Sequence, residues 1–135
     1  MTRINLVPPS ELYDQHLIAE YREITMVPAS LKRTLASKRG YRDEMVPKAF
    51  TLNRGHVSFF YNKGLYLDKR YQEIKEEMTR RGFYNDPDRR FPKEVFPPEL
   101  FNDWTPDADA LALIRERIAL RVSQRPGWYR MTPHK

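Results

Sequence analysis

Apolar side chains recur at alternating steps of four and three residues in three parts of this chain, the spacing of one buried face on an α-helix. The first part predicts a helix from about Asp14 to Ser37, with a kink at Pro28, because proline cannot donate the helical hydrogen bond. Its apolar positions are Leu17, Tyr21, Ile24, Pro28, Leu31 and Leu35. The sequence thus predicts a long, bent amphipathic helix near its start.

The second part predicts a helix from Leu65 to Met78, with Gly82 as its C-terminal stop. Its buried edge consists of Leu67, Tyr71, Ile74 and Met78. This helix should supply much of the core.

The third part follows the stretch TPDADA, in which Thr105 is the expected N-cap and Pro106 the first helical residue. Asp107 and Asp109 fall in the first turn, where acidic side chains are favoured. The predicted core face of this helix consists of Leu111, Ile114, Ile118 and Val122.

Irregular segments separate the three predicted helices. The segment from Gly40 to Gly64 contains the apolar stretch HVSFFY, which has no second strand of comparable quality to pair with. We therefore expect HVSFFY to pack as a buried segment against the helices. The segment from Asn85 to Asp103 is rich in proline and predicts extended coil, and the closing QRPGWYRMTPHK predicts a short extension. The predicted fold is all-α, with residues 1–135 forming a single domain.

Composition limits the chemistry. The 135 residues contain no cysteine, which excludes disulfides, thiolate zinc sites and a cysteine nucleophile. No apolar run approaches the roughly 18 residues of a membrane span, and no secretory signal is evident, so we expect a cytosolic protein with no membrane association. A net charge of +6 favours polyanionic partners such as nucleic acid, although basic charge alone is also compatible with a merely solvated surface.

His16, Glu20 and Glu23 lie at positions i, i+4 and i+7, so on a helix they project from nearly the same face. Three interpretations remain open: a solvated charged face, a pair of carboxylates for catalysis, and a metal site. The metal interpretation is weak, because the paired HExxH spacing is absent and the other histidines are distant in sequence.

The second residue offers a different nucleophile. Initiator methionine is usually removed when a small residue such as Thr2 follows, and this exposes an α-amine. An α-amine has a pKa of about 7.7 to 8.0 against about 10.4 for lysine, so far more of it is unprotonated at neutral pH. Such an amine forms imines readily, and a carboxylate from the first helix would assist its proton transfers. The alternative is an ordinary frayed terminus, and a retained Met1 would block the amine.

Four stretches, MTRINL, DQHLIAEYRE, GHVSFFY and QRPGWY, stand together in the order and spacing of the bacteriophage endonuclease V family. The chain resembles these pyrimidine dimer DNA glycosylases, which also have abasic-site lyase activity, over nearly its whole length. The resemblance implies an all-α protein of three main helices, with its N-terminal segment threaded between them. It further implies removal of the 5′ base of a cyclobutane pyrimidine dimer, with the DNA kinked and a base opposite the lesion turned out.

The resemblance also implies roles for individual residues. Thr2 matches the residue whose α-amine attacks the sugar C1′ to form a Schiff base, and Glu23 matches the essential carboxylate. Arg3 and Arg22 match residues that hold phosphates and the damaged region, and His16 matches a neighbour that orients the site. The implied chemistry, β-elimination included, needs no metal or cofactor.

Further DNA contacts are expected near the C-terminus. Arg117, Arg121 and Arg125 recur at steps of four and form a basic stripe that tracks the DNA backbone or is simply solvated. Trp128, Tyr129 and Arg130 are retained from the family's aromatic, basic tail, and for the two aromatic residues helix-end packing is an equal alternative. His56 is expected to be a packed, hydrogen-bonded histidine.

The chain departs from the family pattern at Met26, where the family has a basic residue, so one phosphate contact does not carry over. The implied partner is double-stranded DNA containing ultraviolet photoproducts, bound by a monomer in the cytoplasm of a bacterial cell or a phage-infected host. Two other functions remain open: a non-catalytic helical module that binds distorted DNA, and a metal-dependent nuclease that uses Glu20 and Glu23.

Overall fold

The computed structural model describes residues 3–135, and every regular element among them is helical, which confirms the all-α prediction. Four helices have ten residues or more, and a fifth is a single turn. They are α1 (Asp14–Glu23), α2 (Met26–Ala36), α3 (His56–Phe59), α4 (Gly64–Arg80) and α5 (Ala108–Gln124). Short 3₁₀ turns occupy η1 (Pro9–Glu11), η2 (Asp43–Met45), η3 (Lys93–Val95) and η4 (Pro98–Leu100).

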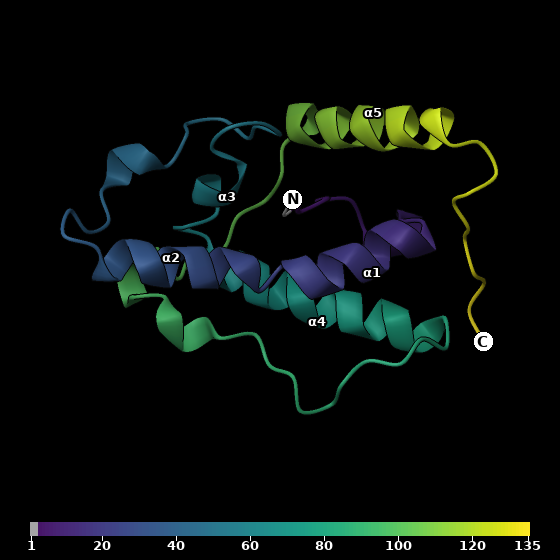
Figure 1. Cartoon of the computed structure of the whole chain (residues 1–135), viewed down its shortest axis with the longest axis horizontal. Helices are drawn as coiled ribbons and strands as arrows, with labels where there is room; N and C mark the ends of the chain where they lie inside the picture. The colour runs from purple at the N-terminus through teal and green to yellow at the C-terminus, as the bar shows by residue number, and fades with distance from the viewer. Residues whose placement is uncertain (1–2) are drawn as a thin grey trace.

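The predicted helix from Asp14 to Ser37 is two helices, and the predicted kink at Pro28 was wrong. The break lies at residues 24–25, and Pro28 is the third residue of α2, where its missing N–H costs no intrahelical hydrogen bond. Because the proline ring clashes with the carbonyl four residues earlier, the interruption falls one turn before Pro28. The two helices run on from each other along the long axis of the molecule (Figure 1).

Helix α4 agrees closely with its prediction. It ends at Arg80, and Gly82 adopts a φ of +82°, a left-handed conformation that suits glycine after a helix. All four predicted core positions, Leu67, Tyr71, Ile74 and Met78, are buried.

Helix α5 begins two residues later than predicted. Asp107, rather than Thr105, is the N-cap, and its carboxylate accepts a 2.8 Å hydrogen bond from the Ala110 N–H. A carboxylate in this place also interacts favourably with the positive end of the helix dipole. Of the predicted core face only Ile114 is fully buried, so much of α5 faces solvent.

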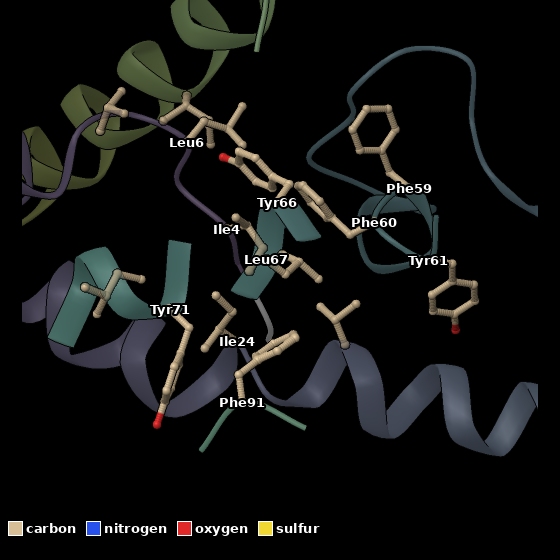
Figure 2. Close-up of a cluster of buried hydrophobic side chains, with 14 of the residues drawn as sticks. Ile4, Leu6, Ile24, Phe59, Phe60, Tyr61, Tyr66, Leu67, Tyr71 and Phe91 are labelled. Atoms are coloured by element: carbon tan, nitrogen blue, oxygen red, sulfur yellow. The ribbon is translucent and has the colours of Figure 1, made fainter. Parts of the chain in front are cut away.

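The N-terminal segment runs through the centre of the molecule, between α5 on one side and α1 and α4 on the other (Figure 1). Ile4 and Leu6 are buried in a cluster that also contains Tyr66 and Leu67 of α4 (Figure 2). The resemblance had implied this threading. Buried apolar surface stabilises the arrangement by about 25 cal/mol per Å².

The stretch HVSFFY forms α3 and the residues after it, and Phe59, Phe60 and Tyr61 are buried, as expected. His56 is a packed histidine: its Nδ1–H donates to the Thr51 carbonyl at 2.8 Å, and its Nε2 accepts from the Ile4 N–H at 3.0 Å. Burial lowers the pKa of His56, and the charge of Arg3 adds to this effect. Because its Nε2 accepts a hydrogen bond from Ile4, the ring is neutral where the chain packs against it.

The C-terminal residues were predicted to be a simple extension, but they pack back onto α1 and α4. Asp14 accepts hydrogen bonds from the N–H and hydroxyl of Thr132, and its carboxylate also binds Arg81 at 2.9 Å. Arg81 and His134 both contact Glu77, at 2.8 Å in each case. We call residues 128–135 the C-terminal strap. The strap was missed because its contacts join positions more than 50 residues apart.

We predict that D14N lowers the free energy of unfolding by about 3 kcal/mol, because it removes one of the two carboxylates, Asp14 and Glu77, that pair with the buried Arg81 guanidinium. Burial raises the pKa of Asp14, but hydrogen bonds from Thr132 and Arg81 outweigh it and leave the pKa below its usual value. The carboxylate therefore contributes stability above pH ~3.9 that is lost as pH falls through the lowered folded-state pKa. Urea unfolding at several pH values measures both effects.

The matched control is D103N, since Asp103 pairs with Lys69 at 2.6 Å but both side chains are about half exposed. Exposed pairs contribute roughly 0–1 kcal/mol, so this variant should unfold close to wild type. Equal losses in D14N and D103N would mean that the strap anchor adds no special stability.

Candidate active site

A cavity of about 400 Å³ opens between α1, the N-terminal segment and α5. Helix α1 contributes His16, Glu20 and Glu23, which the sequence placed on one helical face. The N-terminal segment contributes Arg3 and Asn5. The cavity therefore gathers the two carboxylates, a histidine and an arginine that the sequence singled out, and its volume is in the range of small-ligand sites.

The opposite wall comes from α5 and the C-terminal strap. Arg117 and Arg121 of α5 line the cavity, and so does Tyr129 of the strap. The Tyr129 ring stacks on the His16 ring with centroids 4.7 Å apart. Tyr129 thus packs against His16 of α1 at the cavity, and its contact with DNA stays a prediction.

Glu23 is half buried at the cavity wall. Burial raises the pKa of its carboxyl, and the charge of Glu20 adds to the rise, while Arg3 opposes it. The pKa of Arg3 is lowered by burial and then by the charges of Arg117 and Arg121. Three arginines thus line the same cavity as Glu23, and their charge makes the site attractive to anions.

His16 is partly buried, and its Nδ1 has no hydrogen-bond partner among residues 3–135. Burial lowers its pKa, and the nearby charge of Arg121 lowers it further, while Glu20 acts in the opposite direction. A ring with an unpartnered buried nitrogen is able to make one further hydrogen bond to a bound group.

Glu20 differs from Glu23 because its carboxylate is already engaged. Its side chain is fully buried and pairs with Arg70 at 2.7 Å, and one of its oxygens also accepts two hydrogen bonds from Asn5. Among residues 3–135, no group of three or more His, Cys, Asp or Glu side chains is placed to hold a metal ion. Arg70 and Asn5 occupy the Glu20 oxygens that a metal ion would need.

Other predicted DNA-contacting residues lie outside the cavity. Arg22 is exposed and lines a separate groove with Tyr21 and Arg89. Arg125 is past the end of α5, with its guanidinium 4.0 Å from the centre of the Trp128 ring. Arg130 is exposed in the strap. The predicted stripe of three arginines along α5 therefore contributes only two of them to the cavity.

Thr2, the predicted nucleophile, lies outside the described residues, as does Met1. The described segment begins at Arg3, which lines the cavity and is one peptide bond from Thr2. No helix of the described residues is both long and apolar enough to cross a membrane.

Sequence reasoning missed the part that Asn5 and Arg70 play at this site. Asn5 lies within MTRINL but had no role assigned to it, and Arg70 belongs to no motif and is 50 residues from Glu20. The only available signal was the apolar edge of α4, which turns Arg70 toward the same interior as Leu67 and Tyr71.

We predict that R121A raises the apparent pKa of His16, because it removes a neighbouring positive charge that disfavours protonation of the ring. Two-dimensional NMR of the imidazole carbons as a function of pH measures the value. The shift should be upward and partial, since burial is the larger cause and persists in the variant.

The matched control is R125A, which removes an equal charge from a side chain that stacks on Trp128 instead of facing the cavity. This variant should leave the His16 titration unchanged. A downward shift in R121A, or equal shifts in both variants, would contradict the arrangement of charges described above.

The sequence of this chain also matches a known protein family. The model described as pyrimidine dimer DNA glycosylase matches residues 1–91, which include α1 to α4 and the N-terminal segment. Arg3, His16, Glu20 and Glu23 all fall within the match, whereas α5 and the strap follow it. The chain therefore belongs to the pyrimidine dimer DNA glycosylase family.

Proposed function

We propose that this DNA repair glycosylase removes the 5′ base of cyclobutane pyrimidine dimers through a Schiff base on the Thr2 α-amine. It then cleaves the strand at the resulting abasic site. The observation that carries this proposal is the cavity that half-buried Glu23 lines together with Arg3, Arg117 and Arg121, the first of which directly follows Thr2. In this proposal the protein acts as a monomer, in the cytoplasm, on duplex DNA that contains ultraviolet photoproducts.

The proposed reaction begins when the neutral amine of Thr2 attacks the sugar C1′. The new C–N bond forms as the bond from C1′ to the base breaks, and the base leaves with its electron pair and takes a proton. Opening of the sugar ring then gives an imine between C1′ and the amine. Loss of a C2′ proton expels the 3′ phosphate by β-elimination, and this step nicks the strand.

Glu23 serves this chemistry in two ways. Its negative charge stabilises the cationic sugar and the protonated imine, and its carboxylate accepts or returns protons during ring opening. Burial raises its pKa toward the range in which a carboxyl exchanges protons efficiently near neutral pH. An engaged carboxylate such as Glu20 does not offer this freedom.

The arginines serve binding. Arg3, Arg117 and Arg121 line the cavity and, in the proposal, hold the phosphates that flank the lesion. Arg22, Arg125 and Arg130 lie outside it and contact the DNA backbone farther along, with Trp128 beside Arg125. His16 and Tyr129 form a stacked pair at the wall, which orients the groups bound there.

We predict that E23Q binds dimer-containing duplex with nearly wild-type affinity but removes the base at least about 10²-fold more slowly. Glutamine keeps the size and hydrogen bonding of the side chain and removes only the charge that stabilises the cation. Gel-shift titration and single-turnover kinetics on a duplex with one defined dimer measure the two quantities. Comparable rates in E23Q and wild type would place Glu23 outside the chemistry.

The Schiff base itself is tested by reduction. Borohydride added during the reaction should convert the imine to a stable secondary amine, and peptide mapping should find the DNA on Thr2. Protein that retains Met1, or that carries an acetylated terminus, should still bind damaged duplex but trap nothing. Trapping by the blocked protein would instead point to a lysine.

The same assay separates the alternatives. A non-catalytic DNA-binding module would trap nothing in either form. A metal-dependent nuclease would cleave without trapping and would lose cleavage in EDTA, whereas the proposed chemistry keeps full cleavage in EDTA.

A further inference from the structure

Residues 3–7 are held by side chains from three different helices. The Ile4 N–H donates to His56 of α3 at 3.0 Å. The backbone N–H and the side-chain amide of Asn5 both donate to Glu20 of α1, at 3.0 and 2.9 Å. Arg70 of α4 donates to the carbonyl of Val7. The backbone at three of five successive residues is thus fixed by long-range hydrogen bonds from buried side chains.

Two of these side chains form a buried ion pair. The Arg70 guanidinium binds both oxygens of Glu20, at 2.7 and 3.1 Å, and the side chains are only 3% and 0% exposed. Burying two charges costs solvation energy that their attraction does not always recover, so an apolar pair of similar size often stabilises a fold as well. What an apolar pair lacks is the ability to accept from Asn5 and donate to Val7.

His56 likewise contributes a hydrogen bond that an apolar side chain of similar size would not. Because its Nδ1–H is committed to the Thr51 carbonyl, its Nε2 carries a lone pair aimed at the Ile4 N–H. The site is apolar, with Phe50 and Phe60 against the ring, and Phe or Leu would fill it. Only a hydrogen-bond acceptor at this position fixes where the backbone N–H of Ile4 lies.

The backbone of the held segment is also strained. Leu6 has a φ of +57°, and it is the only non-glycine residue with positive φ among residues 3–135. A left-handed conformation costs a residue with a branched side chain about 1–2 kcal/mol, so it persists only where the surroundings determine it. The hydrogen bonds from the surrounding helices therefore determine the backbone conformation of this segment.

From these observations we infer that His56, Glu20 and Arg70 are positioning residues for the reaction, and we call them the N-terminal clamp. By fixing residues 3–7 they hold Arg3 and Asn5 in the wall of the cavity that Glu23 also lines, one residue from the proposed nucleophile. This inference rests on the proposed function, in which the Thr2 α-amine is that nucleophile. A displacement of about 1 Å at a reacting group can cost about 10²-fold in rate.

His56 provides the sharpest test because its acceptor can be removed or restored. H56L fills the apolar site but leaves the Ile4 N–H unpaired, whereas H56Q returns an oxygen acceptor near the place of Nε2. The measurement is the rate constant of borohydride trapping on a single-dimer duplex, with enzyme in excess. As long as folded enzyme saturates the duplex, this rate constant reports the bound complex and does not change with the unfolded fraction.

We expect H56L to trap about 10²-fold more slowly than wild type with a dissociation constant for damaged duplex within about threefold. H56Q should recover most of the rate. N5A, which removes one donor and leaves the ion pair in place, should slow trapping by a smaller factor. The control is L100A, a buried truncation in η4, which should lower the melting temperature but leave the trapping rate constant unchanged.

The outcomes separate the two proposals. Wild-type protein that traps nothing would overturn the Thr2 mechanism, whatever the variants do. Wild-type protein that traps, with H56L trapping equally fast, would overturn the positioning role and leave the mechanism intact. If H56L does not fold, N5A decides, and a wild-type trapping rate in N5A would count against the clamp. A rate loss in L100A equal to that in H56L would assign the effect to general destabilisation.

Discussion

The buried pair of Glu20 and Arg70 is the interaction on which the rest of this structure depends. It joins α1 to α4, and its remaining hydrogen-bonding capacity goes to Asn5 and Val7 in the N-terminal segment. Removing either partner would leave a charge in a region from which water is excluded, and such losses are among the costliest in proteins. The pair therefore sets the distance between two helices and the path of the segment between them at the same time.

In the candidate site, two carboxylates one turn apart on α1 have different surroundings and therefore different roles. Glu20 is engaged in structural hydrogen bonds, while Glu23 is half buried in a cavity that arginines also line, and burial raises the pKa of its carboxyl. The surrounding cations attract a polyanion, and burial strengthens their effect at short range. Structural anchoring and the candidate chemistry thus share one helical face without competing for the same group.

The site also depends on the last third of the chain. The family match covers residues 1–91, yet Arg117, Arg121 and Tyr129 complete the cavity wall. Few buried contacts hold α5, where only Ala110 and Ile114 are buried. The C-terminal strap ties the chain after α5 to Asp14 and Glu77, and this anchors the end that carries Tyr129 against His16.

The sequence by itself determined the helical content, the buried edge of α4, the stop at Gly82 and the shared face of His16, Glu20 and Glu23, because helical periodicity and local capping depend on neighbours a few residues apart. It misplaced the break before Pro28 and the cap of α5 by a few residues, where several local signals compete. Only the tertiary structure decided that Arg70 pairs with Glu20 and not with Glu23. It also decided that Arg125 lies outside the cavity and that the C-terminal strap packs back onto α1 and α4. These outcomes depend on Arg70, Trp128 and Thr132, whose partners are chosen by burial and packing. Contacts between residues far apart in sequence follow no period, so no pattern along the chain predicts them.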